Sequence, residues 1–75
     1  MASLHRWPSR TLDAFRMRMA GHGFPISGTM MNDDRRYALE QLQHAHTLAD
    51  AGLRALAVEL FAHFERQQSG VAWVN

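Results

Sequence analysis

Histidine is the residue type in this sequence with the clearest chemical potential, because five histidines occur in 75 residues and imidazole binds metal ions and transfers protons. His44 and His46 are two positions apart, which on a helix places them about 200° around the axis and on different faces. His46 and His63 would meet across a helical hairpin, but no carboxylate or third imidazole stands at a spacing that completes a zinc site. We therefore expect no metal and no cofactor, and we interpret the histidines as solvated residues or residues at the edge of an apolar seam.

Covalent catalysis has few candidate residues in this chain. There is no cysteine, which excludes thiol nucleophiles, thiolate metal sites and disulfides. Ser27 and Ser69 lie beside glycines but lack the glycine spacing of a nucleophile elbow. The segment "GHGFPISG" lacks the lysine of a phosphate-binding loop, and the paired acids Asp33 and Asp34 are explained by the start of a helix. We therefore predict that this protein is not an enzyme.

The basic residues are all arginine, and they are unevenly distributed along the chain. Residues 1–30 hold four arginines and one acid, whereas residues 31–75 hold four arginines and six acids. Arginines interleaved with aromatic residues are typical of proteins that bind single-stranded nucleic acids, and here they are Arg6, Arg10, Arg16 and Arg18, with Trp7 and Phe15. The formal net charge of only +1 argues against this function, so nucleic-acid binding is kept as the alternative.

The length of the chain limits it to one small domain. A core built from 75 residues is marginal without disulfides, metal or association, so we expect a homodimer or a larger protein partner. No apolar run approaches the roughly 18 residues that span a bilayer, and the N-terminus lacks the apolar stretch of a secretory signal. We therefore expect a cytoplasmic protein without membrane contact. Arginine in place of lysine, with abundant alanine and leucine, indicates GC-rich coding and a bacterial or phage source.

The elements that would position these residues are helices, so the predicted fold class is all-α. Leu12, Phe15 and Met19 follow at i, i+3 and i+7, which predicts a short helix over about residues 10–20. Three glycines and a proline within residues 21–29 predict a loop. Two methionines follow this loop directly, and we interpret everything before them as an extension whose role in folding is optional.

The second half of the chain carries the strongest helical periodicity. Apolar residues recur at alternating spacings of three and four, which predicts helices over about residues 33–50 and 53–67. Asn32 or Asp33 is expected to cap the first of them. Ser69-Gly70 is expected to end the second, before a short apolar tail.

Gly52 leaves two alternatives open for the connection between these helices. A glycine just beyond the last residue of a helix commonly ends it, and a turn there would let the two halves bury their apolar stripes against each other. Against the turn, the heptad-like register runs through Gly52 without a slip, and Asp50 and Arg54 would form a favourable i,i+4 pair in one continuous helix. We favour the turn, which gives an antiparallel helical hairpin.

Residues on both sides of this position resemble the tetratricopeptide-type helical hairpin. Leu48, Gly52, Ala57 and Phe61 stand where that motif has a large apolar residue, a glycine that closes the first helix, a small residue and an aromatic residue. The resemblance covers about residues 38–67 and occurs once. It implies a helical hairpin and a role in protein binding.

Together these patterns predict an N-terminal extension over residues 1–29 and a helical hairpin interaction domain over residues 30–75. The predicted function is that of a small adaptor or inhibitor, which docks a helical face on a larger regulatory or assembly protein. The residues expected to contact this partner combine charge with a rigid ring, as interface hot spots do: Arg35, Arg36, Tyr37 and Arg54. The residues expected to form a homodimer seam lie on the leucine-rich stripe: Leu42, Leu53, Leu56, Leu60 and Phe64.

Overall fold

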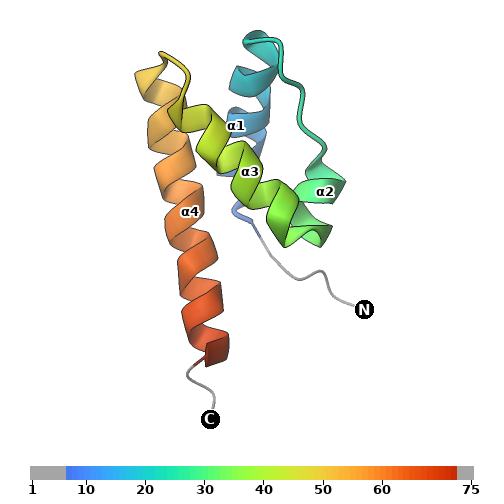
Figure 1. Cartoon of the computed structure of the whole chain (residues 1–75), viewed down its shortest axis with the longest axis vertical. Helices are drawn as coiled ribbons and strands as arrows, with labels where there is room; N and C mark the ends of the chain where they lie inside the picture. The colour runs from blue at the N-terminus through green and yellow to red at the C-terminus, as the bar shows by residue number, and fades with distance from the viewer. Residues whose placement is uncertain (1–6, 73–75) are drawn as a thin grey trace.

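The computed structural model describes residues 7–72, with side chains as far as residue 67, and this part of the chain forms four helices. They are α1 (Ser9–Gly21), α2 (Gly28–Asp33), α3 (Arg35–His46) and α4 (Ala51–Ala72). No strand occurs between residues 7 and 72, so the prediction of an all-α fold is confirmed. Figure 1 shows α3 crossing in front of α1, while α4, the longest helix, runs along one side of the molecule.

The first helix forms where the apolar spacing predicted it, over residues 10–20 with one further residue at each end. The carbonyl of Pro8 accepts the Leu12 N–H at 2.9 Å, which begins the helical hydrogen bonding. Leu12 and Phe15 both face the core, and Phe15 is fully buried. Beyond the helix, Gly23 has a φ of +90°, a left-handed conformation that glycine adopts without strain, and this residue reverses the chain.

The helix predicted over about residues 33–50 forms over residues 35–46 as α3, and Asp34 separates it from the shorter α2. Ser27 caps α2 by accepting a hydrogen bond from the Met30 N–H at 3.1 Å, so this helix begins inside the segment that was predicted as a loop. Asp34 then adopts an extended conformation, with φ −126° and ψ 102°, and its carboxylate accepts the Tyr37 N–H at 3.0 Å. An aspartate in this position satisfies a free N–H at the start of a helix, so Asp34 caps α3. The predicted helix is therefore confirmed over residues 35–46, but it ends four residues earlier than predicted, and its cap is the residue after the two that were expected to supply it.

The chain turns between α3 and α4 at residues 47–50, before Gly52. Asp50 caps α4 by accepting the Leu53 N–H at 3.0 Å, and Gly52 is the second residue of that helix. A turn at Gly52 and a continuous helix through it are therefore both wrong. Gly52 lies beside Arg18, and a Cβ atom at this position would lie 2.9 Å from the Cζ atom at the flexible end of that side chain.

The last helix extends further at both ends than the predicted range of residues 53–67. It runs from Ala51 to Ala72 and passes through Ser69-Gly70, which was expected to end it. A glycine inside a helix costs only about 1 kcal/mol relative to alanine, and the favourable helix propensity of the neighbouring residues can offset this cost. The end of the predicted apolar tail, residues 73–75, lies outside the described residues.

A single core joins the four helices. It consists of Trp7, Leu12, Phe15, Met19, Ile26, Met31, Ala38, Leu42, Ala45, Leu53, Ala57, Leu60 and Phe64. Four of the five residues of the predicted dimer seam belong to this core and expose at most 6% of their surface, while the fifth, Leu56, is partly buried. The physical reason is that α1 packs against α4 and covers the stripe from within the same chain. These residues therefore serve the fold of one chain, and the predicted boundary at residue 29 separates two parts of one core.

Trp7 ties the segment before α1 to two other helices. Its indole N–H donates a buried hydrogen bond to the carbonyl of Met31, with 2.8 Å between the nitrogen and the oxygen. Its ring also stacks on Phe64 of α4, with ring centroids 6.1 Å apart and an angle of 15° between the planes. A buried carbonyl that is left without a donor costs free energy, so this contact favours one fixed position of Trp7.

Candidate functional site

The helices α3 and α4 diverge from the turn that joins them (Figure 1). A groove of about 210 Å³ lies between them, lined by Leu39, Leu42, Gln43, His46 and Phe61. The four residues from α3 are spaced i, i+3, i+4 and i+7, which places them on one face of that helix. Leu42 is 2% exposed and Leu39 is partly buried, so the groove has an apolar floor that reaches the surface.

Phe61 forms the α4 side of this groove. Its side chain is 40% exposed, and its ring stacks on the buried Phe64, with centroids 6.4 Å apart and an angle of 17° between the planes. Val58, three residues earlier, is 56% exposed. An aromatic ring held by a buried neighbour loses little conformational freedom on binding, and aromatic residues contribute much of the energy of protein interfaces. The exposed residues Val58 and Phe61 of α4 are therefore suited to contact another protein.

Two of the predicted contact residues, Arg35 and Arg36, are exposed at the start of α3. Arg35 precedes Leu39 by four residues and Leu42 by seven, so it lies on the groove face of the helix. Arg36 lies beside that face, and its Nε atom is 3.8 Å from a carboxylate oxygen of Glu40. Both side chains of this ion pair are well exposed, so the pair contributes little to stability and leaves the charges accessible.

The other two predicted contact residues differ in their surroundings. Arg54 is exposed on α4, seven residues before Phe61, and its Nε atom donates to the carbonyl of Leu48 at 3.3 Å. Tyr37 is partly buried against the core, and its hydroxyl accepts the Ser27 N–H at 3.1 Å, which holds the start of α2. The structure therefore brings three arginines to the two helices of the groove and places Tyr37 in a contact within the chain.

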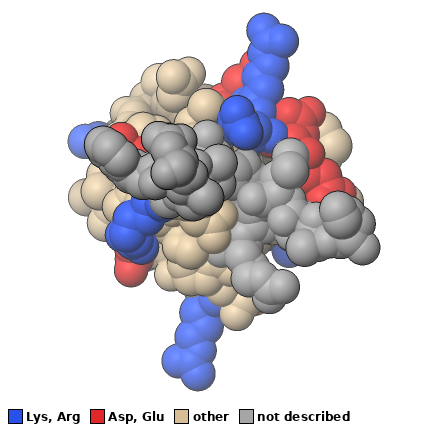
Figure 2. All heavy atoms as spheres, turned by 90° about the horizontal axis from the view of Figure 1, so that it is seen from below, with Lys and Arg blue, Asp and Glu red and all other residues tan. Residues whose placement is uncertain are grey.

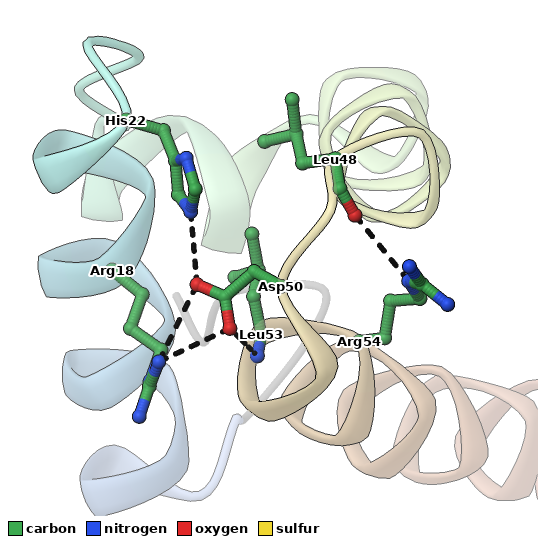
Figure 3. Close-up of polar contacts among 6 residues, drawn as sticks. All are labelled: Arg18, His22, Leu48, Asp50, Leu53 and Arg54. Atoms are coloured by element: carbon green, nitrogen blue, oxygen red, sulfur yellow. Dashed lines mark hydrogen bonds and ion pairs between the residues drawn. The ribbon is translucent and has the colours of Figure 1, made fainter.

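A cluster of polar groups centred on Asp50, here called the Asp50 cluster, joins the end of α1 to the start of α4 (Figure 3). The Asp50 carboxylate accepts the Leu53 N–H at 3.0 Å and two contacts from Arg18 Nη1 at 3.1 and 3.3 Å. The Nε2 atom of His22 lies 2.8 Å from the same carboxylate. The hydrogen bond from His22, followed by the Leu53 N–H and the charge of Arg18, lowers the pKa of Asp50 from 3.8 to about 2. Each of these contacts joins two segments of the same chain, so we assign the cluster a structural role.

The Asp50 cluster predicts a dependence of stability on acid. Because the pKa of Asp50 is about 2 in the folded protein and its ordinary value is 3.8, its contribution is complete above pH 3.8 and is lost as the pH falls toward 2. An Asp50→Asn variant keeps a good N-cap residue but has no charge to titrate. We expect the melting temperature of the wild-type protein to fall more steeply over this window than that of the variant, as measured by circular dichroism. Parallel curves for the two proteins would contradict the assignment.

The four histidines that the structure describes have different surroundings. His22 belongs to the Asp50 cluster, and His44 packs edge-on against Phe24 with ring centroids 4.3 Å apart. His46 lines the groove, and His63 lies on α4. Within the described part of the chain, no three side chains of His, Cys, Asp or Glu lie close enough together to hold a metal ion.

The N-terminal arginines that would bind nucleic acid are partly engaged in contacts within the chain. Arg16 Nε donates to the carbonyl of Ile26 at 3.2 Å, and Arg18 binds Asp50, while Arg6 lies outside the described residues. Figure 2 shows the molecule from below, where basic side chains appear at the top, left and bottom of the view and acidic side chains lie between them, most of them at the upper right. The described part of that face therefore lacks the continuous basic surface typical of nucleic-acid binding.

A wider and more open depression of about 420 Å³ lies over α1 and the loop that follows it. Its lining mixes charged and apolar side chains: Asp13, Arg16, Met17, Ala20, Pro25 and Ile26. Met17 is 75% exposed. The Arg16 guanidinium packs over Gly28, where a Cβ atom would lie 3.2 Å from Nη1, so this side chain fixes the loop. The groove between α3 and α4 differs from this depression in having an exposed aromatic ring, Phe61, in its lining and no charged side chain except that of His46 when it is protonated.

Among the residues that the structure describes, no helix has both the length and the apolar composition needed to cross a membrane, and this includes the 22-residue α4. Comparison of the chain with protein-family models, with curated proteins and with solved structures finds no match. The groove, its exposed aromatic residue and the neighbouring arginines are therefore the features on which a function can be based.

Proposed function

We propose that this chain is a protein-binding module that docks the surface formed by α3 and α4 on a larger protein. The observation that carries this proposal is the apolar groove beside Phe61, a 40% exposed ring that stacks on a buried one. Exposed aromatic and arginine side chains around an apolar centre are the combination found at interface hot spots. The Asp50 cluster and the core fix both helices in advance, so the surface needs little ordering when a partner binds.

An adaptor or inhibitor is the type of protein that fits such a surface, because it acts by occupying a site on its partner. The resemblance of the segment around Gly52, Ala57 and Phe61 to a tetratricopeptide hairpin supports protein binding by analogy. A bacterial or phage source remains a prediction from the arginine-rich composition. Homodimerisation also remains a prediction, and it would have to use exposed residues such as Val58 and Phe61, because the leucine stripe lies in the core.

A binding experiment with the full chain tests the proposed function. The wild-type protein and a Phe61→Asp variant are immobilised and exposed to lysate of the source cells, with Met17→Asp as the matched control on α1. We expect the wild-type and the Met17 variant to retain the same partner, and the Phe61 variant to lose it, because a carboxylate in the groove must be desolvated. Equal retention of that partner by the Phe61 variant would overturn the proposal.

Nucleic-acid binding through the N-terminal arginines is the alternative function, and it has a simple test. A labelled single-stranded oligonucleotide is titrated with the protein at several salt concentrations, and its fluorescence anisotropy is measured. Binding that weakens steeply with added salt would favour this alternative, because released counterions drive such complexes. We expect no such binding.

A further inference from the structure

We propose that the groove between α3 and α4 receives one amphipathic α-helix of the partner protein, whose apolar stripe enters the groove and whose flanking acidic residues meet Arg35 and Arg54. This inference rests on the proposed function and specifies the chemistry of the partner. Three features support it: the shape of the groove, the packing of α1 on the other side of α4, and the charges beside the apolar floor.

The walls of the groove select a helix over an extended peptide. Between Leu39 and His46 the axis of α3 rises by about 10 Å, which corresponds to two turns of a bound helix. Both walls are helices, whose backbone N–H and C=O groups already bond within the helix. They offer no free edge to which an extended peptide could add as a strand. Side chains spaced i, i+3, i+4 and i+7 instead form the ridges and grooves into which another helix packs.

The chain already packs one helix against α4, on the side opposite the groove. α1 places Leu12, Phe15 and Met19, at i, i+3 and i+7, in the core, and its Arg18 lies against Gly52. Phe61 follows Gly52 by nine residues, which places it about 180° around the axis of α4. No residue of α1 lines the groove. A partner helix with the same apolar spacing would therefore pack against the side of α4 that α1 leaves uncovered.

The charges beside the groove favour acidic residues at the ends of the apolar stripe. Arg35 is exposed on the groove face of α3 and makes no ion pair with another described residue. Arg54 shares a strip of α4 with Val58 and Phe61, at i, i+4 and i+7. Glu65 is the acid on that strip, and it lies about 16 Å along the helix from Arg54. A carboxylate of the bound helix that lies near the 47–50 turn would therefore contact Arg54 without being repelled by Glu65.

A second copy of this chain is a poorer occupant than a partner helix. A second copy would bring the same strip of α4 to the groove, and Glu65 is the one acid among the described residues of that strip. It would therefore offer a carboxylate to only one of the two arginines of each groove, Arg35 or Arg54. A helix with acidic flanks provides the complementary charge.

Two designed peptides of roughly 14 residues, a length at which an isolated helix becomes marginally stable, serve as probes. They share one leucine stripe at i, i+3 and i+7 and differ in carrying glutamate or lysine beside it. Fluorescence anisotropy measures binding to the full chain, and amide chemical shifts locate the contact. We expect the glutamate peptide to bind at least about tenfold more tightly than the lysine peptide and to perturb residues of α3 and α4 around Leu39 and Phe61.

Charge-reversal variants make the test specific for the two arginines. In Arg35→Glu/Arg54→Glu we expect the preference to change to the lysine peptide. The control Arg10→Glu/Arg66→Glu alters net charge equally at exposed positions on α1 and away from the groove on α4, and should keep the glutamate preference. Val58→Asp should weaken both peptides, and circular dichroism confirms that each variant remains folded. Equal binding of the two peptides by the wild-type chain would overturn the inference. Changes in amide chemical shift that are confined to α1 would also overturn it.

The test also separates this inference from the proposed function. If neither peptide binds while Phe61→Asp still abolishes capture of a natural partner, the helical occupant is wrong and the protein-binding surface stands. If capture is also insensitive to Phe61→Asp, both proposals fail. A doubled molar mass in solution that excludes the peptides would identify a second copy as the occupant and overturn the partner helix.

Discussion

Replacing Phe15 by alanine is expected to remove about 3–5 kcal/mol from the free energy of unfolding, the usual cost of emptying a buried aromatic site. Phe15 is 0% exposed and lies at the centre of the face that α1 presents to the core. Small domains are stable by only about 5–15 kcal/mol, and a chain of 75 residues belongs at the lower end of that range. A large fraction of the Phe15→Ala protein should therefore be unfolded without denaturant.

Met17 supplies the matched control for this experiment. It lies two residues further along the same helix and is 75% exposed, so Met17→Ala removes a large apolar side chain without opening a cavity. We expect its urea midpoint, followed by circular dichroism, to match that of the wild-type protein closely. Similar losses of stability in the two variants would mean that α1 does not pack as described.

A chain that begins at Met30 is expected to fail to fold on its own. The deletion removes Leu12, Phe15, Met19 and Ile26 from the core and exposes the faces of α3 and α4 that they cover. It also removes Arg18 and His22 from the Asp50 carboxylate. Short isolated helices are marginal in water, so the remaining helices depend on this packing for most of their stability.

The measurement is the helical signal of the truncated chain at low protein concentration, where association does not replace the lost contacts. We expect weak helicity and no cooperative thermal transition, in contrast to the full chain. A cooperative transition in the truncated protein would restore the interpretation of residues 1–29 as an optional extension. It would also require another explanation for the complete burial of Phe15 and Met19.

Three of the four predicted contact residues could be placed on the surface from sequence, but the groove itself could not. Arg35, Arg36 and Arg54 are exposed because charged side chains are costly to bury, and this preference depends on residue type alone. The groove depends on the angle at which α3 leaves α4, and that angle is set by packing over the whole core. Tyr37 is partly buried, and its hydroxyl accepts the N–H of Ser27, in a segment that was predicted as a loop.

The polar contacts of the Asp50 cluster could also not be predicted from the sequence. The sequence offered Arg54 as the partner of Asp50, at i,i+4 in a continuous helix, whereas the structure gives it Arg18, 32 residues earlier in the chain. Aspartate is a favoured N-cap residue, and this preference was the local signal for a helix beginning at residue 51. Gly52 then lies against the Arg18 guanidinium, a contact that no nearby residue reveals.

By itself, the sequence determined that this protein is helical, where its first helix lies and which stripe of leucines must be covered. Tertiary structure alone decided that α1 of the same chain covers most of that stripe, where α3 begins and where α4 begins. The physical reason is the range of the interactions. Helical periodicity joins residues three and four apart and can be read locally, whereas the choice of what buries an apolar face depends on residues that are distant in the chain.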